Sequence, residues 1–221
     1  MEAVRREPME VSIPPFGLGG HYAPPETGAG VVVFAHGSGS SRFSPRNRFV
    51  ADALREAGLG TLLFDLLRSE EAEDRHKVFD IPLLAQRLMN ATDWLTSPAG
   101  AGGAVPIGYF GASTGAAAAL AAAALHPDPV RAVVSRGGRP DLAGAEMLPH
   151  VCAPTLLIVG SLDREVLELN RTAAAHMRCE VEVRVVQGAS HLFEEPGTLD
   201  TAVALARDWF ATRLGEDRGL L

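Results

Sequence analysis

The pentapeptide Gly111-Ala112-Ser113-Thr114-Gly115 constrains the fold of this chain more than any other feature. It follows a short apolar run at residues 105–110, which is typical of a buried strand. It precedes an alanine block at residues 116–125, which predicts a closely packed helix. The flanking glycines lack a Cβ, so the backbone can turn sharply where strand and helix meet. We therefore expect Ser113 on a tight strand-to-helix turn that exposes its hydroxyl.

Strand-like and helix-like patterns alternate along the rest of the chain, and short spacings separate them. Further strands are expected at residues 9–13, 17–23, 31–35, 60–65, 130–135, 156–160 and 181–186, and further helices at residues 48–57, 81–96, 165–177 and 198–214, with a short helical connection at 142–151. This alternation predicts an α/β fold with a mostly parallel sheet and helices on both faces. The first two strands would form an antiparallel hairpin and make the sheet mixed.

The sequence gives more specific expectations for three segments. Helix 48–57 is expected to bury Phe49, Ala53 and Ala57 on one face and to end at Gly58. Residues 66–80 are charged and irregular, which favours a solvated surface loop, with an active-site flap as the alternative. Residues 99–103 are expected to form a flexible turn.

Length and composition limit the classes of protein that need to be considered. A chain of 221 residues fits a single domain, 1–221, with frayed ends at 1–8 and 215–221. A net charge of -7 argues against binding nucleic acid or an anionic membrane. No apolar run approaches the roughly 20 residues of a membrane span, and no apolar segment follows Arg5-Arg6, so a cytoplasmic protein is expected.

No metal or cofactor is expected either. The two cysteines, Cys152 and Cys179, lack metal-ligand spacing and predict buried thiols in a reducing compartment. The sequence contains no H-E-x-x-H motif, and no G-x-G-x-x-G or phosphate-binding loop opens a strand-to-helix turn.

The expected strand ends place three complementary side chains on one rim of the sheet. Ser113 follows one strand, Asp163 follows strand 156–160, and His191 lies in the loop after strand 181–186. A serine hydroxyl needs a base to take its proton, and the base needs a third group to orient it. We therefore predict a catalytic triad of Ser113, His191 and Asp163.

Alternatives remain for two members of the triad. His36 could serve as the base, although we interpret it as holding its own loop by a hydrogen bond. Asp65 could replace Asp163 as the acid, and Asp163 could also cap the following helix.

An oxyanion hole requires two backbone N–H groups that point at the reacting carbonyl oxygen. Thr114, directly after the serine, is the first candidate, and Ser38, in the loop after strand 31–35, is the second. Gly37 and Gly39 would let this loop approach the substrate.

Two arginines could bind a carboxylate or phosphate of the substrate at the same rim, Arg42 after the oxyanion loop and Arg136 after strand 130–135. The alternative is that both pair with local carboxylates or cap loops.

Four segments resemble the dienelactone hydrolase type of α/β-hydrolase: VVVFAHGSGSS, GYFGASTGAAAAL, PTLLIVGSLDREV and QGASHLFEEPG. The resemblance extends over nearly the whole chain. It implies an eight-stranded sheet without a cap domain, and hydrolysis of small esters or lactones. Dienelactone hydrolase itself has a cysteine nucleophile where this chain has Ser113, so the resemblance favours a general carboxylesterase. The family triad corresponds to Ser113, Asp163 and His191.

The predicted activity is therefore a two-step acyl transfer to water on a small-molecule ester, with short acyl groups favoured by an open, shallow site. An acyltransferase or peptidase with the same triad remains an alternative, as does a non-catalytic binding protein. The sequence leaves homodimer formation open.

Overall fold

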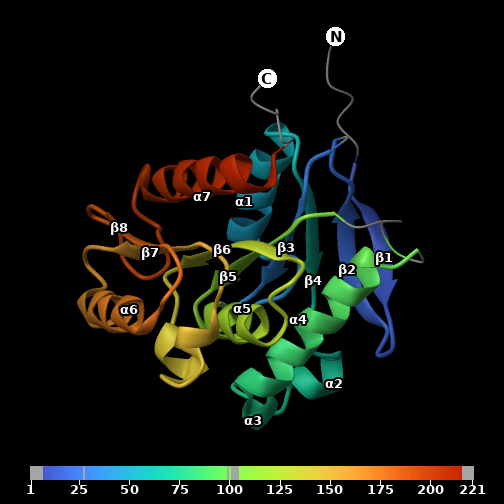
Figure 1. Cartoon of the computed structure of the whole chain (residues 1–221), viewed down its shortest axis with the longest axis horizontal. Coiled ribbons are helices and arrows are strands. Elements are labelled where there is room, and N and C mark those ends of the chain that lie inside the picture. The colour runs from blue at the N-terminus through green and yellow to red at the C-terminus, as the bar shows by residue number, and fades with distance from the viewer. Residues whose placement is uncertain (1–6, 27, 99, 101–104, 216–221) are drawn as a thin grey trace.

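A computed structural model describes residues 7–26, 28–98, 100 and 105–215. Its centre is an eight-stranded sheet of order β1-β2-β4-β3-β5-β6-β7-β8 (Figure 1). The strands are β1 Met9–Ile13, β2 Leu18–Ala23, β3 Val31–Ala35, β4 Gly60–Phe64, β5 Ile107–Ala112, β6 Val130–Arg136, β7 Thr155–Gly160 and β8 Val181–Val186. Strand β2 runs antiparallel to both of its neighbours, and all other pairs are parallel. The predicted mixed sheet with an N-terminal hairpin is confirmed.

Helices cover the sheet on both faces (Figure 1). Helices α1 Pro45–Glu56 and α7 Thr198–Leu214 lie on one face, while α4 Ile81–Thr96, α5 Thr114–Leu125 and α6 Arg164–His176 lie on the other. Two large hydrophobic clusters fill the layers between helices and sheet, and a small third cluster lies between α6 and the β7–β8 edge. Strands β3, β4, β5 and β7 are buried along their whole length, because helices cover them from both sides.

The alanine block explains how α5 fits against the centre of the sheet. Residues 116–123 are 0–5% exposed, and every one of them except Leu120 is alanine. Small side chains let the helix approach the sheet and α4 closely while filling the space between them. The position of α5 matters for function because its first residue follows Ser113 directly.

Helix α1 differs from the expectation in both its start and its buried face. It begins at Pro45, where the Ser44 side chain accepts a hydrogen bond from Asn47 N–H and caps the helix. Its buried side carries Val50 and Leu54, whereas Phe49 is 44% exposed. The predicted buried face of Phe49, Ala53 and Ala57 was wrong: Phe49 and Ala57 are exposed and Ala53 is half-buried, because the stripe that faces the sheet contains Val50 and Leu54.

The segment 66–80 is more ordered than the expected surface loop. It contains two short helices, α2 Ser69–Ala72 and α3 Arg75–Val78, which lie near the start of α4 (Figure 1). Glu71 in α2 is buried against Arg87 of α4, with 3.1 Å between its carboxylate and the guanidinium. The charged residues of this segment, which predicted a solvated loop, therefore include a glutamate that is buried in an ion pair with α4. The connection expected at 142–151 forms two 3-10 helices, η1 Pro140–Ala143 and η2 Leu148–His150.

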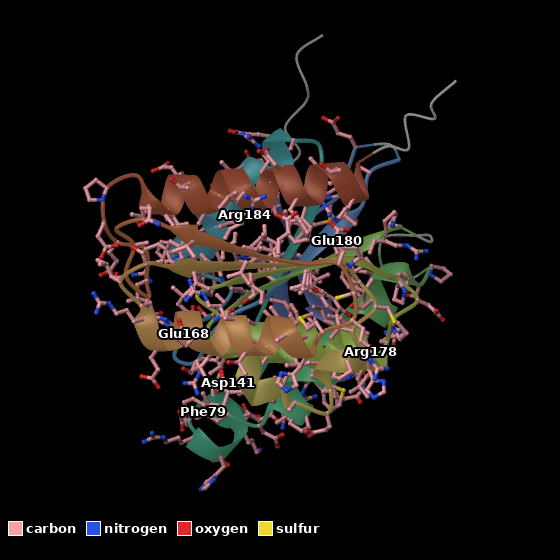
Figure 2. All side chains as sticks on the ribbon, turned by 60° about the vertical axis from the view of Figure 1, so that its left-hand side comes forward. Phe79, Asp141, Glu168, Arg178, Glu180 and Arg184 are labelled. Atoms are coloured by element: carbon pink, nitrogen blue, oxygen red, sulfur yellow. The ribbon has the colours of Figure 1, made fainter. Side chains whose placement is uncertain are left out.

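The edge strand β8 carries charge on its outer surface, which disfavours pairing with another chain. Arg184 lies at this edge (Figure 2) and donates a hydrogen bond of 2.9 Å to Glu182 on the same strand. Among the described residues, no helix is long and apolar enough to cross a membrane. Most of the expected turn at 99–103 and most of both predicted frayed ends lie outside the described residues.

Candidate active site

Ser113 occupies a strained turn between β5 and α5. Its φ of 51° and ψ of -121° lie where L-residues are rarely found. The glycines beside it are required by close packing. A Cβ on Gly111 would lie 2.4 Å from Ala116 Cα, and one on Gly115 would lie 2.1 Å from the carbonyl oxygen of Ala35. The sequence therefore forms this turn because no side chain larger than hydrogen fits at either flank.

Asp163 and His191 reach the same rim from β7 and β8. Asp163 follows β7 and starts α6, yet its side chain makes no capping hydrogen bond to that helix. The loop that carries His191 packs closely over the end of β7, since a Cβ on Gly160 would lie 2.2 Å from the carbonyl oxygen of Ala189. The carboxylate of Asp163 is thus left to face the histidine.

The three side chains form one hydrogen-bonded series. His191 Nδ1 lies 2.6 Å from Asp163 Oδ2, and His191 Nε2 lies 3.3 Å from Ser113 Oγ. The Asp163 side chain is 15% exposed and that of His191 is 37% exposed. The carboxylate therefore fixes the imidazole from the protein side, while the serine end stays accessible to solvent.

The two alternatives weighed from the sequence have other partners. His36 lies with Nδ1 3.0 Å from Gly37 O, and its Nε2 accepts a 3.2 Å hydrogen bond from Leu66 N–H. Burial lowers the pKa of His36, which keeps the ring neutral near pH 7. Asp65 accepts a 2.8 Å hydrogen bond from Arg42 N–H and pairs with the guanidinium of the same residue. Among the hydrogen bonds of the described residues, neither side chain is a partner of Ser113.

The Ser38 loop lies against the start of α5. The Ser38 N–H donates a 2.8 Å hydrogen bond to Thr114 Oγ1. A Cβ on Gly37 would lie 3.1 Å from Ser113 Cβ, so the loop backbone closely approaches the serine. Within the described residues, neither the Thr114 N–H nor the Thr114 hydroxyl proton is used in a hydrogen bond.

The two rim arginines have different surroundings. Arg42 is the partner of Asp65 and packs over Phe43, with its guanidinium carbon 4.3 Å from the ring centroid. Arg136 is 7% exposed and lies 5.8 Å from the centroid of Phe193. Its Nε and Nη1 are buried without a hydrogen-bond partner in the part of the chain described here. Burial lowers the pKa of Arg136 to about 10, which still leaves it charged at neutral pH.

A cavity of about 570 Å³, here called the side pocket, opens beside the Ser113 turn. The loop 36–43 forms one wall, residues 65–78 of the segment containing α2 and α3 form the other, and Leu84 and Thr114 complete the lining. Ser113 and His191 are not lining residues, so the side pocket adjoins the hydrogen-bonded series through Thr114 and Ser38.

No group of three His, Cys, Asp or Glu side chains within residues 7–26, 28–98, 100 and 105–215 is placed to hold a metal ion. The sequence did not indicate two features of this site. One is the Thr114 hydroxyl, whose position directly after the serine was the only available signal. The other is the side pocket, whose apolar residues were hidden in a charged segment.

Comparisons with known proteins identify the family and the fold. A family model described as an alpha/beta hydrolase domain matches residues 28–206. A crystal structure of dienelactone hydrolase from Anabaena variabilis is 52% identical with a TM-score of 0.88, covering 95% of this chain and 98% of that one. The Est1E structure from Butyrivibrio proteoclasticus is 14% identical with a TM-score of 0.76, covers 94% of this chain and 98% of that one, and shows the fold alone.

Two curated relatives come from Mycobacterium tuberculosis, strains H37Rv and CDC 1551, and both are provisionally named phosphoribosyl transferases. Each is 58% identical over 212 residues, which is 96% of this chain and 47% of the relative. The chain thus spans about half the length of these relatives. The fold, the family match and the hydrolase neighbours together support a hydrolase, and the chain belongs to the α/β-hydrolase family, with a dienelactone hydrolase-like fold.

Proposed function

We propose that the protein is a serine hydrolase that cleaves small carboxylic esters or lactones through Ser113, His191 and Asp163. The observation that carries the proposal is the hydrogen-bonded series from Asp163 Oδ2 through the imidazole to Ser113 Oγ, with separations of 2.6 and 3.3 Å. These separations suit proton transfer from the serine to the imidazole as the hydroxyl attacks.

The reaction proceeds in two acyl-transfer steps. His191 Nε2 takes the proton of Ser113 as Oγ bonds to the ester carbonyl carbon, and the same imidazole then protonates the departing alcohol. Water loses a proton to His191 as it attacks the acyl-enzyme carbonyl carbon, and the imidazolium returns this proton to Ser113 Oγ as the serine–acyl bond breaks and the acid leaves. Asp163 keeps Nδ1 protonated and stabilises the imidazolium that forms in each step.

Thr114 and Ser38 hold the oxyanion in this mechanism. The free N–H of Thr114 is one backbone donor, and the N–H of Ser38 becomes the second when it shares its hydrogen bond to Thr114 Oγ1 with the oxyanion. Because Thr114 Oγ1 accepts from Ser38 N–H, its own proton points away from that nitrogen and is available to the oxyanion as a further donor. The hole then consists of two backbone groups and one side-chain hydroxyl.

The name of the mycobacterial relatives is not carried over to this chain. Those relatives are about twice as long, and the match covers 47% of each. The side chains assembled at Ser113 have the arrangement of an acyl-transfer site, which a phosphoribosyl transfer does not require.

The test is hydrolysis of short-chain p-nitrophenyl esters by the wild type, Ser113→Ala and His191→Ala. We expect kcat/KM to fall by several orders of magnitude in both variants, because the members of a triad act as one unit. A fluorophosphonate should label Ser113 in the wild type and in neither variant. Absence of both turnover and labelling in the wild type would favour a non-catalytic binding protein.

A competing alcohol separates hydrolysis from acyl transfer. If the acyl-enzyme is reserved for another acceptor, adding an alcohol to the ester assay should yield the transfer ester as the main product. If the protein is a hydrolase, free acid should remain the main product. A parallel assay with p-nitroanilides tests the peptidase alternative.

A further inference from the structure

We propose that the side pocket binds the acyl group of the substrate, and that this group is neutral, mainly apolar and larger than acetyl. The proposal rests on the proposed serine-hydrolase function and identifies the substrate class for that site. It also adds a cavity beside the solvent-accessible serine, where the sequence led us to expect only an open, shallow site.

The position of the side pocket assigns it to the acyl side of the ester. Ser38 and Thr114, the proposed oxyanion donors, line the pocket, whereas His191 does not. The leaving alcohol must lie near His191 Nε2, because the imidazole protonates it. The carbonyl oxygen points at Ser38 and Thr114, and the acyl chain can therefore extend past these residues into the cavity.

The charges that line the side pocket cancel locally. Arg42 and Asp65 pair with each other through both the backbone N–H and the guanidinium of the arginine. His36 is the other titratable lining residue, and burial keeps it neutral near pH 7. An acyl group with a carboxylate would enter a cavity that offers it no free cation, so a neutral group fits better.

The size and lining of the side pocket favour an apolar chain or ring. Leu66, Leu67, Val78 and Leu84 provide the apolar surface, and serine hydroxyls lie mainly on the wall formed by loop 36–43. A volume of about 570 Å³ lies in the range of cavities that enclose a whole small-molecule ligand. An acetyl group would leave most of this space to water.

The wall formed by α2 and α3 is fixed by the buried carboxylate of Glu71. This carboxylate accepts a 3.0 Å hydrogen bond from Arg68 N–H and a 3.1 Å hydrogen bond from Arg87 of α4. Arg87 in turn stacks 3.4 Å above the ring of Phe16. Figure 2 shows Phe79, which follows α3, at the periphery of the molecule, so the pocket is bounded by Val78 rather than by this aromatic ring.

The first experiment measures kcat/KM for p-nitrophenyl esters from acetyl to dodecanoyl. We expect about a fourfold rise for each added methylene while the chain fills the side pocket, followed by a plateau or decline. The same number of methylenes added to the alcohol, in alkyl acetates, should give a much weaker dependence. The complementary result, a strong dependence on the alcohol alone, would overturn the assignment to the acyl side.

Two tryptophan variants test the location. Ala72 lines the side pocket and is exposed, so Ala72→Trp can enter the cavity without disturbing the core. We expect the ratio of hexanoyl to acetyl kcat/KM to fall at least tenfold in this variant. The matched control is Glu73→Trp, which adds the same side chain at the neighbouring exposed position outside the lining and should keep the wild-type ratio. An equal ratio in both variants would refute the pocket as the acyl site.

Labelling and binding separate this proposal from the proposed function. If Ser113 is labelled by a fluorophosphonate but acetyl esters are the best substrates, the hydrolase stands and the acyl-pocket proposal fails. If Ser113 is not labelled, the hydrolase fails, and calorimetry with octanamide and octanoate tests the pocket directly. Saturable binding of the amide in preference to the anion, lost in Ala72→Trp, would support the pocket, and no binding would overturn it.

Discussion

The Thr114 hydroxyl provides the sharpest test of the oxyanion hole. Thr114→Val removes the hydroxyl and keeps the β-branched shape of a side chain that is only 4% exposed. The backbone N–H groups of residues 114 and 38 both remain. The substitution therefore removes the hydroxyl donor together with the acceptor of Ser38 N–H, while both backbone donors stay in the chain.

The expected magnitude follows from the hydrogen bonds that Thr114 makes and offers. Its Oγ1 accepts the 2.8 Å hydrogen bond that holds the Ser38 loop, and its proton is free to meet the developing charge. A hydrogen bond to a charged group contributes about 1.5–3 kcal/mol, which corresponds to a loss of about 10- to 150-fold in kcat. The loss should appear in kcat more than in KM, because the negative charge exists only in the transition state.

The assay is steady-state hydrolysis of p-nitrophenyl butyrate, with Thr114→Ser as the variant that restores the hydroxyl. Thr92→Val is the matched control for stability, since Thr92 is equally buried but bonds to Tyr109 and Leu88 O away from the site. It should lower the unfolding midpoint without the loss in kcat. An unchanged kcat in Thr114→Val would refute the hydroxyl as an oxyanion donor. A higher kcat would refute it as well, because it would show that the hydroxyl competes with the substrate for Ser38 N–H.

Three further predictions concern buried ionisable side chains. Arg136→Met should lower kcat/KM more for an ester with a carboxylate in its leaving group than for a neutral ester, and equal losses would remove Arg136 from the binding site. Glu71→Gln should lower the free energy of unfolding by about 3 kcal/mol in urea titrations, because the buried Arg87 then lacks a negatively charged partner. Adding Arg87→Met to the Glu71→Gln chain should recover part of this loss. Since burial lowers the pKa of His36 in the folded state, the unfolded chain takes up a proton first as pH falls below about 6.5, and folding stability should decline by up to about 1.4 kcal/mol per pH unit. His36→Gln should flatten that decline between pH 7 and 5, and an identical slope in both proteins would contradict it.

The sheet and the order of its helices could be predicted from the sequence because they depend on local patterns. Continuous apolar runs mark strands covered on both faces, and the spacing of apolar residues marks helices. The strand-turn-helix pattern around Ser113 is also local, since the two flanking glycines indicate that the backbone there leaves no room for a side chain. The carboxyl ends of parallel strands share one rim, which is why Asp163 and His191 could be placed beside Ser113 before the structure was known.

The tertiary structure decided which polar side chains meet. Arg42 pairs with Asp65, 23 positions away, and Thr114 accepts from Ser38, 76 positions away. The segment 66–80 resembled a solvated loop, but Glu71 is buried against Arg87 and its neighbours enclose the side pocket. A sequence pattern shows that a residue is polar and therefore needs hydrogen-bonding or charged partners. It does not show whether water or a distant side chain supplies them. Only the packing of the chain determines which of the two it finds.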